Sequence, residues 1–298
     1  MKAIRLSHIL IILSVLLASC ATVDTPDSNK TFDPALVDLL RPNAEQGDAN
    51  SQFLLGALYE EGEGVPQDYS EAARWYRLAA EQGHASSQLF LGVMYVLGQG
   101  IPRDYAEGAR WFHAAAEQGV AEAQFRLGNM YTSGQGIPRD YAEGARWFRA
   151  AAEQGVTGAQ FRLGVSYVNG RGVTQDYAKA VRWFRAAAEQ GDASGQLGLG
   201  TSYDLGQGVA QDDAEATRWY RLAAEQGLAG AQLGLGNMYA LGRGLPEDYV
   251  LAHQWFNLAA AQGNQMAARN RELVEDRMTP TQIAEAHRLA RNWLTAQE

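Results

Sequence analysis

Apolar and small residues return along this chain in the same order every 36 residues. In the first period, one set of them is spaced by three and four residues, which places the whole set on one apolar stripe of a helix. Its members are Gln52, Leu55, Gly56 and Tyr59. A second apolar stripe with helical spacing follows at Trp75. Each period therefore predicts two amphipathic helices.

Glycine and aspartate mark the ends of these helices. The pair Gly62 and Gly64 ends the first helix, because glycine adopts backbone angles that a side chain would forbid. Asp68 is placed to cap the second helix, and Glu71 three residues later completes a capping box. Gly83 stops the second helix. Neither helix can bury its apolar stripe alone, so neighbouring pairs must stack.

The 36-residue unit occurs six times, from residue 49 to residue 264. One tryptophan stands at the same place in every unit, at Trp75, Trp111, Trp147, Trp183, Trp219 and Trp255. Six copies at one helical position predict a core residue. The equally regular aspartate is predicted to be a helix cap, because a catalytic acid has no reason to occur six times. Repeats of this length indicate a stack of helical pairs.

The sequence shared by the units resembles a known repeat. It reads L-G-x-x-Y-x-x-G-x-G-V-x-x-D-Y-x-x-A-x-x-W-[YF]-x-x-A-A-x-x-G, which is similar to the Sel1-like repeat, a longer-looped relative of the tetratricopeptide repeat. The resemblance implies an all-α fold, an α/α solenoid wound as a right-handed superhelix of six Sel1-like repeats with N- and C-terminal capping helices. It also implies that the first helix of each pair lines the concave side, and that the protein is an adaptor that binds other proteins.

Both ends of the repeat array predict capping helices. Residues 33–48 are expected to form the N-terminal one, although Pro42 should kink or shorten it. Residues 265–298 are expected to form C-terminal capping helices, and the last of these begins with a capping box at Thr279. The first of them carries Arg271 where the repeats have leucine, so a more polar side is expected there.

The N-terminal residues indicate a targeting segment and a tether. Residues 1–19 form a signal peptide, with a short basic start and an apolar run too short to span a bilayer comfortably. The run ends in Leu-Ala-Ser-Cys, which resembles the lipobox of bacterial lipoproteins and implies acylation of Cys20. Residues 20–32 are then the lipidated cysteine and a flexible tether. By the same resemblance, Ala21 favours the bacterial outer membrane, with the protein facing the periplasm; the alternative is an ordinary secretory signal.

Charge and composition restrict the possible partners and chemistry. The sequence has 25 Lys and Arg against 34 Asp and Glu, a formal net charge of −9, so no nucleic-acid partner is expected. Cys20 is the single cysteine, which excludes intramolecular disulfides and multi-cysteine metal sites. The histidines lack metal-ligand spacing, and the nucleophile motifs of hydrolases are missing. We therefore expect no catalytic residue, no metal and no cofactor.

Partner specificity is expected where the repeats differ from one another. Positions 2, 6, 9 and 13 of each unit, counted from its opening residue, vary between units and lie opposite the packing stripe of the first helix. We predict that the partner-binding concave face includes Leu54, Phe90, Val93, Leu97, Arg126, Asn129, Arg162, Asn169 and Asn237.

Two kinds of contact are predicted within this face. Phe90, Val93 and Leu97 would form an apolar anchor, and anchors of this kind dominate interface energy. Arg126 and Arg162 would flank the anchor and bind carboxylates of the partner. The alternative is that Phe90 and Leu97 pack against the next helix and that both arginines are solvated.

The sequence predicts a non-enzymatic, protein-binding scaffold that is held in the bacterial envelope by its lipid anchor alone. Within that class, a general envelope adaptor competes with an immunity protein that neutralises a periplasm-delivered toxin such as a phospholipase effector. A surface-displayed member that sequesters a host protein is a third possibility. Some cysteine-rich relatives have been described as β-lactamases, but this chain lacks every repeat cysteine, which weakens the case for such an envelope enzyme.

Overall fold

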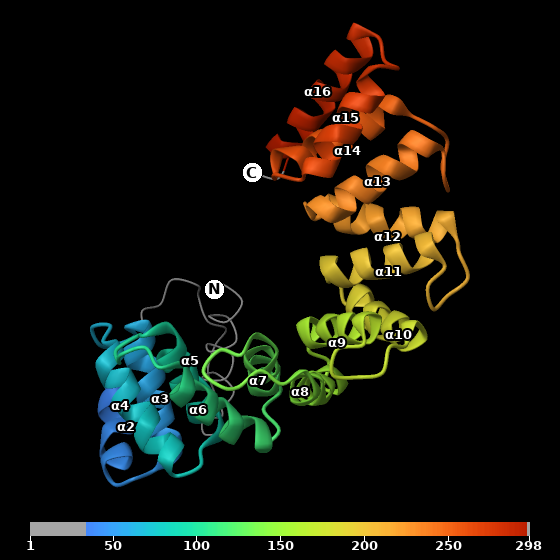
Figure 1. Cartoon of the computed structure of the whole chain (residues 1–298). Helices are drawn as coiled ribbons and strands as arrows, with labels where there is room; N and C mark the ends of the chain where they lie inside the picture. Colours follow the sequence, from blue (N-terminus) through green and yellow to red (C-terminus); the bar gives the residue numbers. More distant parts are fainter. Residues whose placement is uncertain (1–33, 297–298) are drawn as a thin grey trace, which may run out of the picture. The chain divides into compact units, whose positions relative to one another are not determined.

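The computed structural model describes residues 34–296, and this part of the chain is helical without any strand. Two helices correspond to each repeat, and further helices lie at both ends (Figure 1). The helices are α2 Pro34–Glu45, α3 Ala49–Glu61, α4 Tyr69–Glu81, α5 Ala85–Leu97, α6 Tyr105–Glu117, α7 Ala121–Ser133, α8 Tyr141–Glu153, α9 Thr157–Asn169, α10 Tyr177–Glu189, α11 Ala193–Leu205, α12 Asp213–Glu225, α13 Ala229–Leu241, α14 Tyr249–Ala261, α15 Gln265–Glu275 and α16 Pro280–Thr295. The predicted all-α fold of stacked helical pairs is confirmed.

The signal peptide, Cys20 and the tether fall in residues 1–33, outside the described part of the chain. The described part begins within the expected N-terminal capping helix. This helix, α2, continues through Pro42 to Glu45, so the proline does not end it. Among residues 34–296, no helix has both the length and the apolar character needed to span a membrane.

The chain divides into two compact units, with the boundary inside the third repeat. Residues 34–140 are called the N-terminal unit and residues 141–296 the C-terminal unit. Within each unit, the helices up to α15 each pack against the next one along the chain, as α3 does against α4 and α11 against α12, whereas α16 packs against α14. A first helix such as α5 therefore lies between the second helix of its own repeat and that of the preceding repeat (Figure 1).

The repeated tryptophans lie in the core, as the sequence predicts. Trp75, Trp111, Trp147, Trp219 and Trp255 are at most 8% exposed. Trp183 of the fourth repeat differs, because it is only partly buried.

A glycine contact explains why the repeats keep the Leu-Gly pair. In five repeats, the aromatic residue that follows the tryptophan lies against the glycine of this pair. A Cβ atom at Gly164 would lie 2.6 Å from the ring of Phe184, and one at Gly198 of the next repeat would lie 2.9 Å from the same ring. The first contact recurs between Tyr76 and Gly56, Phe112 and Gly92, Tyr220 and Gly200, and Phe256 and Gly236. These glycines allow a helix backbone to touch a ring.

A ladder of buried glutamines joins the repeats. Sequence analysis assigns Gln52 and its equivalents to an apolar stripe, but their amides both donate and accept hydrogen bonds. Gln88 donates from Nε2 to the carbonyl of Ala80 (3.1 Å) and accepts from Nε2 of Gln118 (2.7 Å). The same pair of bonds forms at Gln52, Gln160, Gln196 and Gln232. Buried amides need such partners, which explains the repeated glutamine.

The capping aspartates act as predicted, but the capping box does not close. Asp68 accepts from the backbone N–H groups of Ser70 (2.8 Å) and Glu71 (3.1 Å). The backbone N–H of Asp68 donates to the carbonyl of Tyr59 instead of to a glutamate side chain. Glu71 pairs with Arg74 at 3.2 Å. The reciprocal half of the box is therefore replaced by an ion pair. At Thr279, in contrast, the predicted box forms completely.

Buried His253 of α14 links the two C-terminal helices α15 and α16. Its Nε2 lies 2.7 Å from a carboxylate oxygen of Glu275 on α15, and its ring meets the ring of His287 on α16 edge to face. Nδ1 is buried without a hydrogen-bond partner among the described residues. Burial lowers the pKa of His253, and the positive charges of His287 and Arg271 act in the same direction, whereas Glu275 opposes them.

We expect the C-terminal unit to lose stability as the pH falls below the ordinary histidine pKa of 6.5. The folded chain has the lower pKa at His253, so the unfolded chain binds the proton more readily between the two values. The free energy of unfolding should therefore decrease as pH falls through this interval and stay level above it. Urea denaturation at a series of pH values measures this slope.

The control is a His253→Gln chain, which cannot take up the proton and should show a smaller slope. Both chains carry His84→Gln, because burial also lowers the pKa of His84 and would add a slope of its own. An equal slope in the two chains would contradict the assignment to His253.

Candidate protein-binding face

Three first helices end in a leucine that is exposed to solvent. Leu97 and Leu205 are each 57% exposed, and Leu241 is 64% exposed. All three occupy position 13, directly before the left-handed glycine that caps the helix. We call the residues at positions 2, 6, 9 and 13 of the first helices the first-helix face. Its position 13 therefore presents apolar side chains at a regular place in several repeats.

Position 6 of this face is less exposed than the sequence suggests. Phe90 stacks on Tyr76 with ring centroids 5.5 Å apart, and it also lies 5.9 Å from the ring of Phe53. Leu54 packs against the same cluster of buried residues. Phe90 therefore covers the second face of a ring whose first face lies against Gly56. Phe90 therefore packs within the fold, as the alternative expected, but against the preceding helix α4 and not against the next one.

The other two residues of the predicted apolar anchor remain closer to solvent. Val93 is partly buried, and Leu97, one turn further along α5, is mostly exposed. The outer end of α5 therefore offers an apolar side chain that the fold does not use. This is the part of the predicted anchor that a partner can reach.

The two predicted arginines lie in different units and have different surroundings. In the N-terminal unit, Arg126 lies over the ring of Phe112 and pairs with Glu122 of its own helix at 2.7 Å. In the C-terminal unit, Arg162 is exposed and has no partner among the described residues. Arg162 is thus the freer of the two for a carboxylate of a partner.

The three predicted asparagines also differ from one another. Asn129 is partly buried on α7. Asn169 is exposed and donates to the carbonyl of Val165 in its own helix at 3.0 Å. Asn237 accepts from Nδ2 of Asn270 on α15 at 2.8 Å, so it joins two first helices.

Sequence analysis missed two exposed apolar residues on α15. Met266 is 61% exposed and Leu273 is 64% exposed. Arg271 made this helix seem polar, although Met266 and Leu273 occupy positions 2 and 9, which belong to the first-helix face. Counting these positions beyond residue 264 would have found them.

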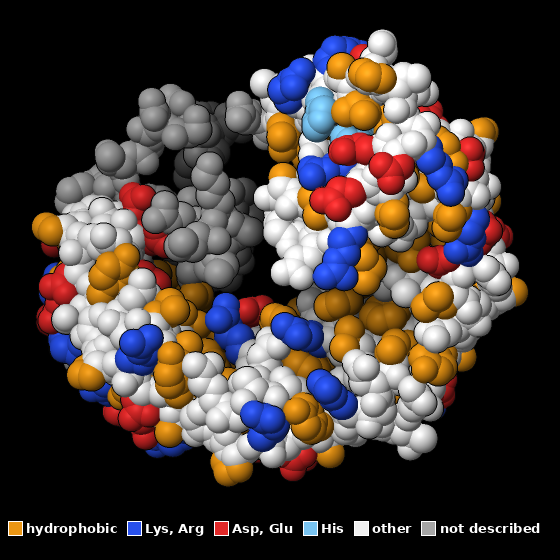
Figure 2. All heavy atoms as spheres, turned by 45° about the horizontal axis from the view of Figure 1, so that its top comes forward, with side chains coloured by type: hydrophobic (Ala, Val, Ile, Leu, Met, Phe, Trp, Pro, Cys, Tyr) orange, Lys and Arg blue, Asp and Glu red, His pale blue; other side chains and the backbone are white. Residues whose placement is uncertain are grey.

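These residues add to the exposed leucines on the first-helix face of the C-terminal unit. The bond between Asn237 and Asn270 places α13 beside α15, and α11 contacts α13. Leu241 and Leu273 each follow their asparagine by one helical turn, and the two helices run in the same direction, so both leucines lie on the same side of that bond. We call Leu205, Leu241, Met266 and Leu273 the C-terminal apolar patch. The space-filling view shows hydrophobic side chains lying among basic, acidic and uncharged ones on the surface (Figure 2).

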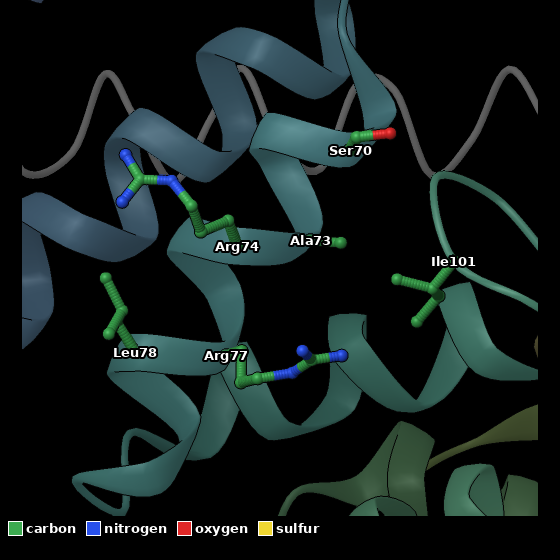
Figure 3. Close-up of a pocket in the computed structure, with 6 residues that line it drawn as sticks. All are labelled: Ser70, Ala73, Arg74, Arg77, Leu78 and Ile101. Atoms are coloured by element: carbon green, nitrogen blue, oxygen red, sulfur yellow. The ribbon is translucent and has the colours of Figure 1, made fainter.

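A small pocket between the second helix α4 and the loop at Ile101 is a weaker candidate. Its volume is about 150 Å³, and it is lined by Ser70, Ala73, Arg74, Arg77, Leu78 and Ile101 (Figure 3). Pockets for drug-sized ligands usually measure at least about 300 Å³. Arg74 is held by Glu71, and Arg77 donates to the hydroxyl of Tyr95. Residues 34–296 also contain no cluster of three His, Cys, Asp or Glu residues that could hold a metal ion.

Comparison with known proteins identifies the repeat. The Sel1 repeat family model matches six consecutive segments, residues 49–84, 85–120, 121–156, 157–192, 193–228 and 229–264. They coincide with the six units read from the sequence. No curated protein matches the chain.

Solved structures with the same repeat are similar over most of the chain. One is a protective antigen present in uropathogenic Escherichia coli strains, which displays an SLR fold: identity is 38%, the TM-score is 0.75, and the alignment covers 86% of this chain and 56% of the antigen. The chain therefore spans little more than half the length of that protein. Another is a Sel1 repeat protein from Oxalobacter formigenes, with 33% identity, a TM-score of 0.64, and coverage of 76% of this chain and 96% of that one.

Proposed function

Because the chain belongs to the Sel1 repeat family, whose solenoids are typically protein-binding scaffolds, we propose that it binds a protein partner through its C-terminal apolar patch. The observation that carries this proposal is the exposure of four large apolar side chains, Leu205, Leu241, Met266 and Leu273, on the first-helix face of one unit. Scattered exposed leucines are ordinary, but neighbouring ones on one face are typical of interaction sites.

The chemistry of the patch favours a partner with an apolar surface. Full burial of one leucine stabilises a complex by about 1.5–3 kcal/mol, and residues of this kind can dominate the binding energy. Arg162 in the same unit is free to pair with a carboxylate at the edge of such a contact. In the N-terminal unit, Leu97 offers a further apolar contact. The role we propose is binding, without catalysis.

We further propose that the protein acts in the bacterial envelope, anchored in the outer membrane by acylated Cys20 and facing the periplasm. The support is the lipobox-like Leu-Ala-Ser-Cys at the end of the leader. Several acyl chains hold a protein durably on a membrane. Fractionation of the envelope tests the anchor: a Cys20→Ser chain should leave the membrane fraction, and its persistence there would refute the anchor.

Site-specific photo-crosslinking in the native envelope tests the binding surface. The full chain carries a photoreactive amino acid at position 241, at position 97, or at position 222 as the control. Leu222 is also an exposed leucine of the C-terminal unit, but it lies on the second helix α12. We expect one protein adduct from position 241 that does not form from position 222. Equal adducts from both positions, or none from 241, would refute the proposal.

The identity of the adduct then separates the possible roles. A secreted toxin or phospholipase effector would indicate an immunity protein, an envelope component would indicate an adaptor, and a host protein would indicate surface display. With the partner in hand, the double variant Leu205→Ser and Leu241→Ser should weaken binding about thirtyfold or more, since each lost anchor costs at least about 1 kcal/mol. Its melting temperature should stay unchanged, because both side chains already lie in water.

A further inference from the structure

The second helices carry a three-residue arrangement on their outer surface. A glutamate in the first turn pairs with an arginine three residues later, at 2.8–3.3 Å, and that arginine lies 4.1–4.9 Å above the ring of the next residue, tryptophan. The four copies are Glu71–Arg74–Trp75, Glu107–Arg110–Trp111, Glu143–Arg146–Trp147 and Glu215–Arg218–Trp219. The arginine is thus neutralised by a carboxylate and stacked on a ring at the same time.

The fourth repeat has the arginine and the tryptophan but lacks the glutamate. Lys179 stands in its place, and it pairs with Asp176 at 3.1 Å. Arg182 is exposed and has no partner among the described residues, and Trp183 is only partly buried. The change replaces a negative charge by a positive one directly beside an arginine. This helix surface therefore lacks the carboxylate that the other four repeats supply.

We propose that Arg182, beside Lys179 and Trp183, binds a carboxylate of a partner protein, within a segment rich in glutamate or aspartate. In the four complete repeats this arginine is paired with a carboxylate, so the missing member defines the chemistry of the ligand. Guanidinium binds carboxylate with two parallel hydrogen bonds. Lys179 is itself paired with Asp176, so its part is to leave Arg182 without the glutamate that the other arginines have. The site lies on α10, a second helix, so it goes beyond the proposed use of the first-helix face and stands independently of it.

The charge around this site is local. The whole chain has a formal net charge of −9, so an acidic peptide is not attracted by the protein in general. Arg185, one turn after Arg182, is already bonded to the hydroxyl of Tyr203 at 2.8 Å. The neighbouring arginines Arg146 and Arg218 are each held by their own glutamate. Arg182 is therefore the arginine of this ladder that is available for an external carboxylate.

Titration of the full chain with acetyl-hexaglutamate amide, followed by NMR, tests the proposal. The indole N–H signal of each tryptophan reports on its own repeat, and a Trp183→Phe chain assigns the signal of the fourth repeat. We expect the Trp183 signal to shift in a saturable way with hexaglutamate but not with hexaglutamine. In Lys179→Glu the chain supplies its own carboxylate, so the affinity for hexaglutamate should fall at least tenfold. The melting temperature should not fall, because the substitution completes the arrangement found in the other repeats.

A second variant transfers the site. Glu143→Lys removes the carboxylate of the third repeat, and the Trp147 signal should then respond to hexaglutamate as Trp183 does. The proposal is overturned if all tryptophan signals shift alike, or if Lys179→Glu binds hexaglutamate as well as the parent chain. It is also overturned, in favour of a membrane contact, if vesicles of phosphatidylglycerol change the Trp183 signal in a Lys179-dependent way while hexaglutamate does not.

Discussion

Replacing Phe184 by alanine is expected to lower the free energy of unfolding by about 3–5 kcal/mol. The ring is 5% exposed, and glycine backbone lies against both of its faces, at Gly164 and at Gly198. Glycines have no side chain that can move into the space, so the cavity should remain largely open. Urea denaturation followed by circular dichroism measures the loss, and hydrogen exchange should show it in α9 to α12.

Phe112→Ala is the matched comparison in another repeat. The first face of this ring also lies against a glycine, Gly92, but the long side chain of Arg126 lies over the other face. That side chain can move into part of the space, so Phe112→Ala should cost less than Phe184→Ala. If Phe112→Ala cost as much or more, the two glycine contacts would not be what makes the Phe184 site sensitive.

Replacing Gly164 by alanine is expected to destabilise the C-terminal unit by about 2 kcal/mol. In an exposed helix the same change would stabilise by about 1 kcal/mol, because alanine has the higher helix propensity. Here the new Cβ would lie 2.6 Å from both Cδ1 and Cε1 of Phe184, so the ring or the helix must shift. The sign of the effect, measured by urea denaturation, therefore distinguishes close packing from ordinary helix propensity.

Two further chains control this prediction. At Gly230 an added Cβ would meet Cδ2 of Leu197 at 3.1 Å, the end of a flexible side chain, so Gly230→Ala should be neutral or stabilising. In the double variant Gly164→Ala with Phe184→Ala the ring is gone, so the alanine should fit, and the double variant should be no less stable than Phe184→Ala alone. A fully additive loss would contradict the proposed clash.

Local signals predicted the helix ends well, because a cap depends on residues close in sequence. Asp68 caps its helix as expected, since its carboxylate needs only the N–H groups two and three residues ahead. The role of Glu71 could not be predicted in the same way. Its carboxylate had two possible partners, and the backbone N–H of Asp68 is taken by the carbonyl of Tyr59 across the loop.

The candidate site was harder to predict than the fold. A helical wheel places Phe90 opposite the packing stripe, yet Phe90 stacks on Tyr76. The wheel assumes one buried side, whereas α5 is contacted by the second helices of two repeats. Arg126 and Arg162 occupy equivalent positions, but one is paired with a glutamate and the other is exposed. Equivalent positions in a repeat therefore do not have equivalent surroundings.

The sequence by itself determined the repeat, its period, the two helices of each unit and the caps that separate them. These follow from spacing along the chain, and the same spacing occurs six times. Only the tertiary structure decided which varying side chains stay in water. Whether Phe90 is covered, whether Leu241 is exposed and whether Arg182 lacks a carboxylate depend on the side chains and backbone around each residue. Some of those neighbours come from the next repeat, so spacing within a single unit cannot reveal them.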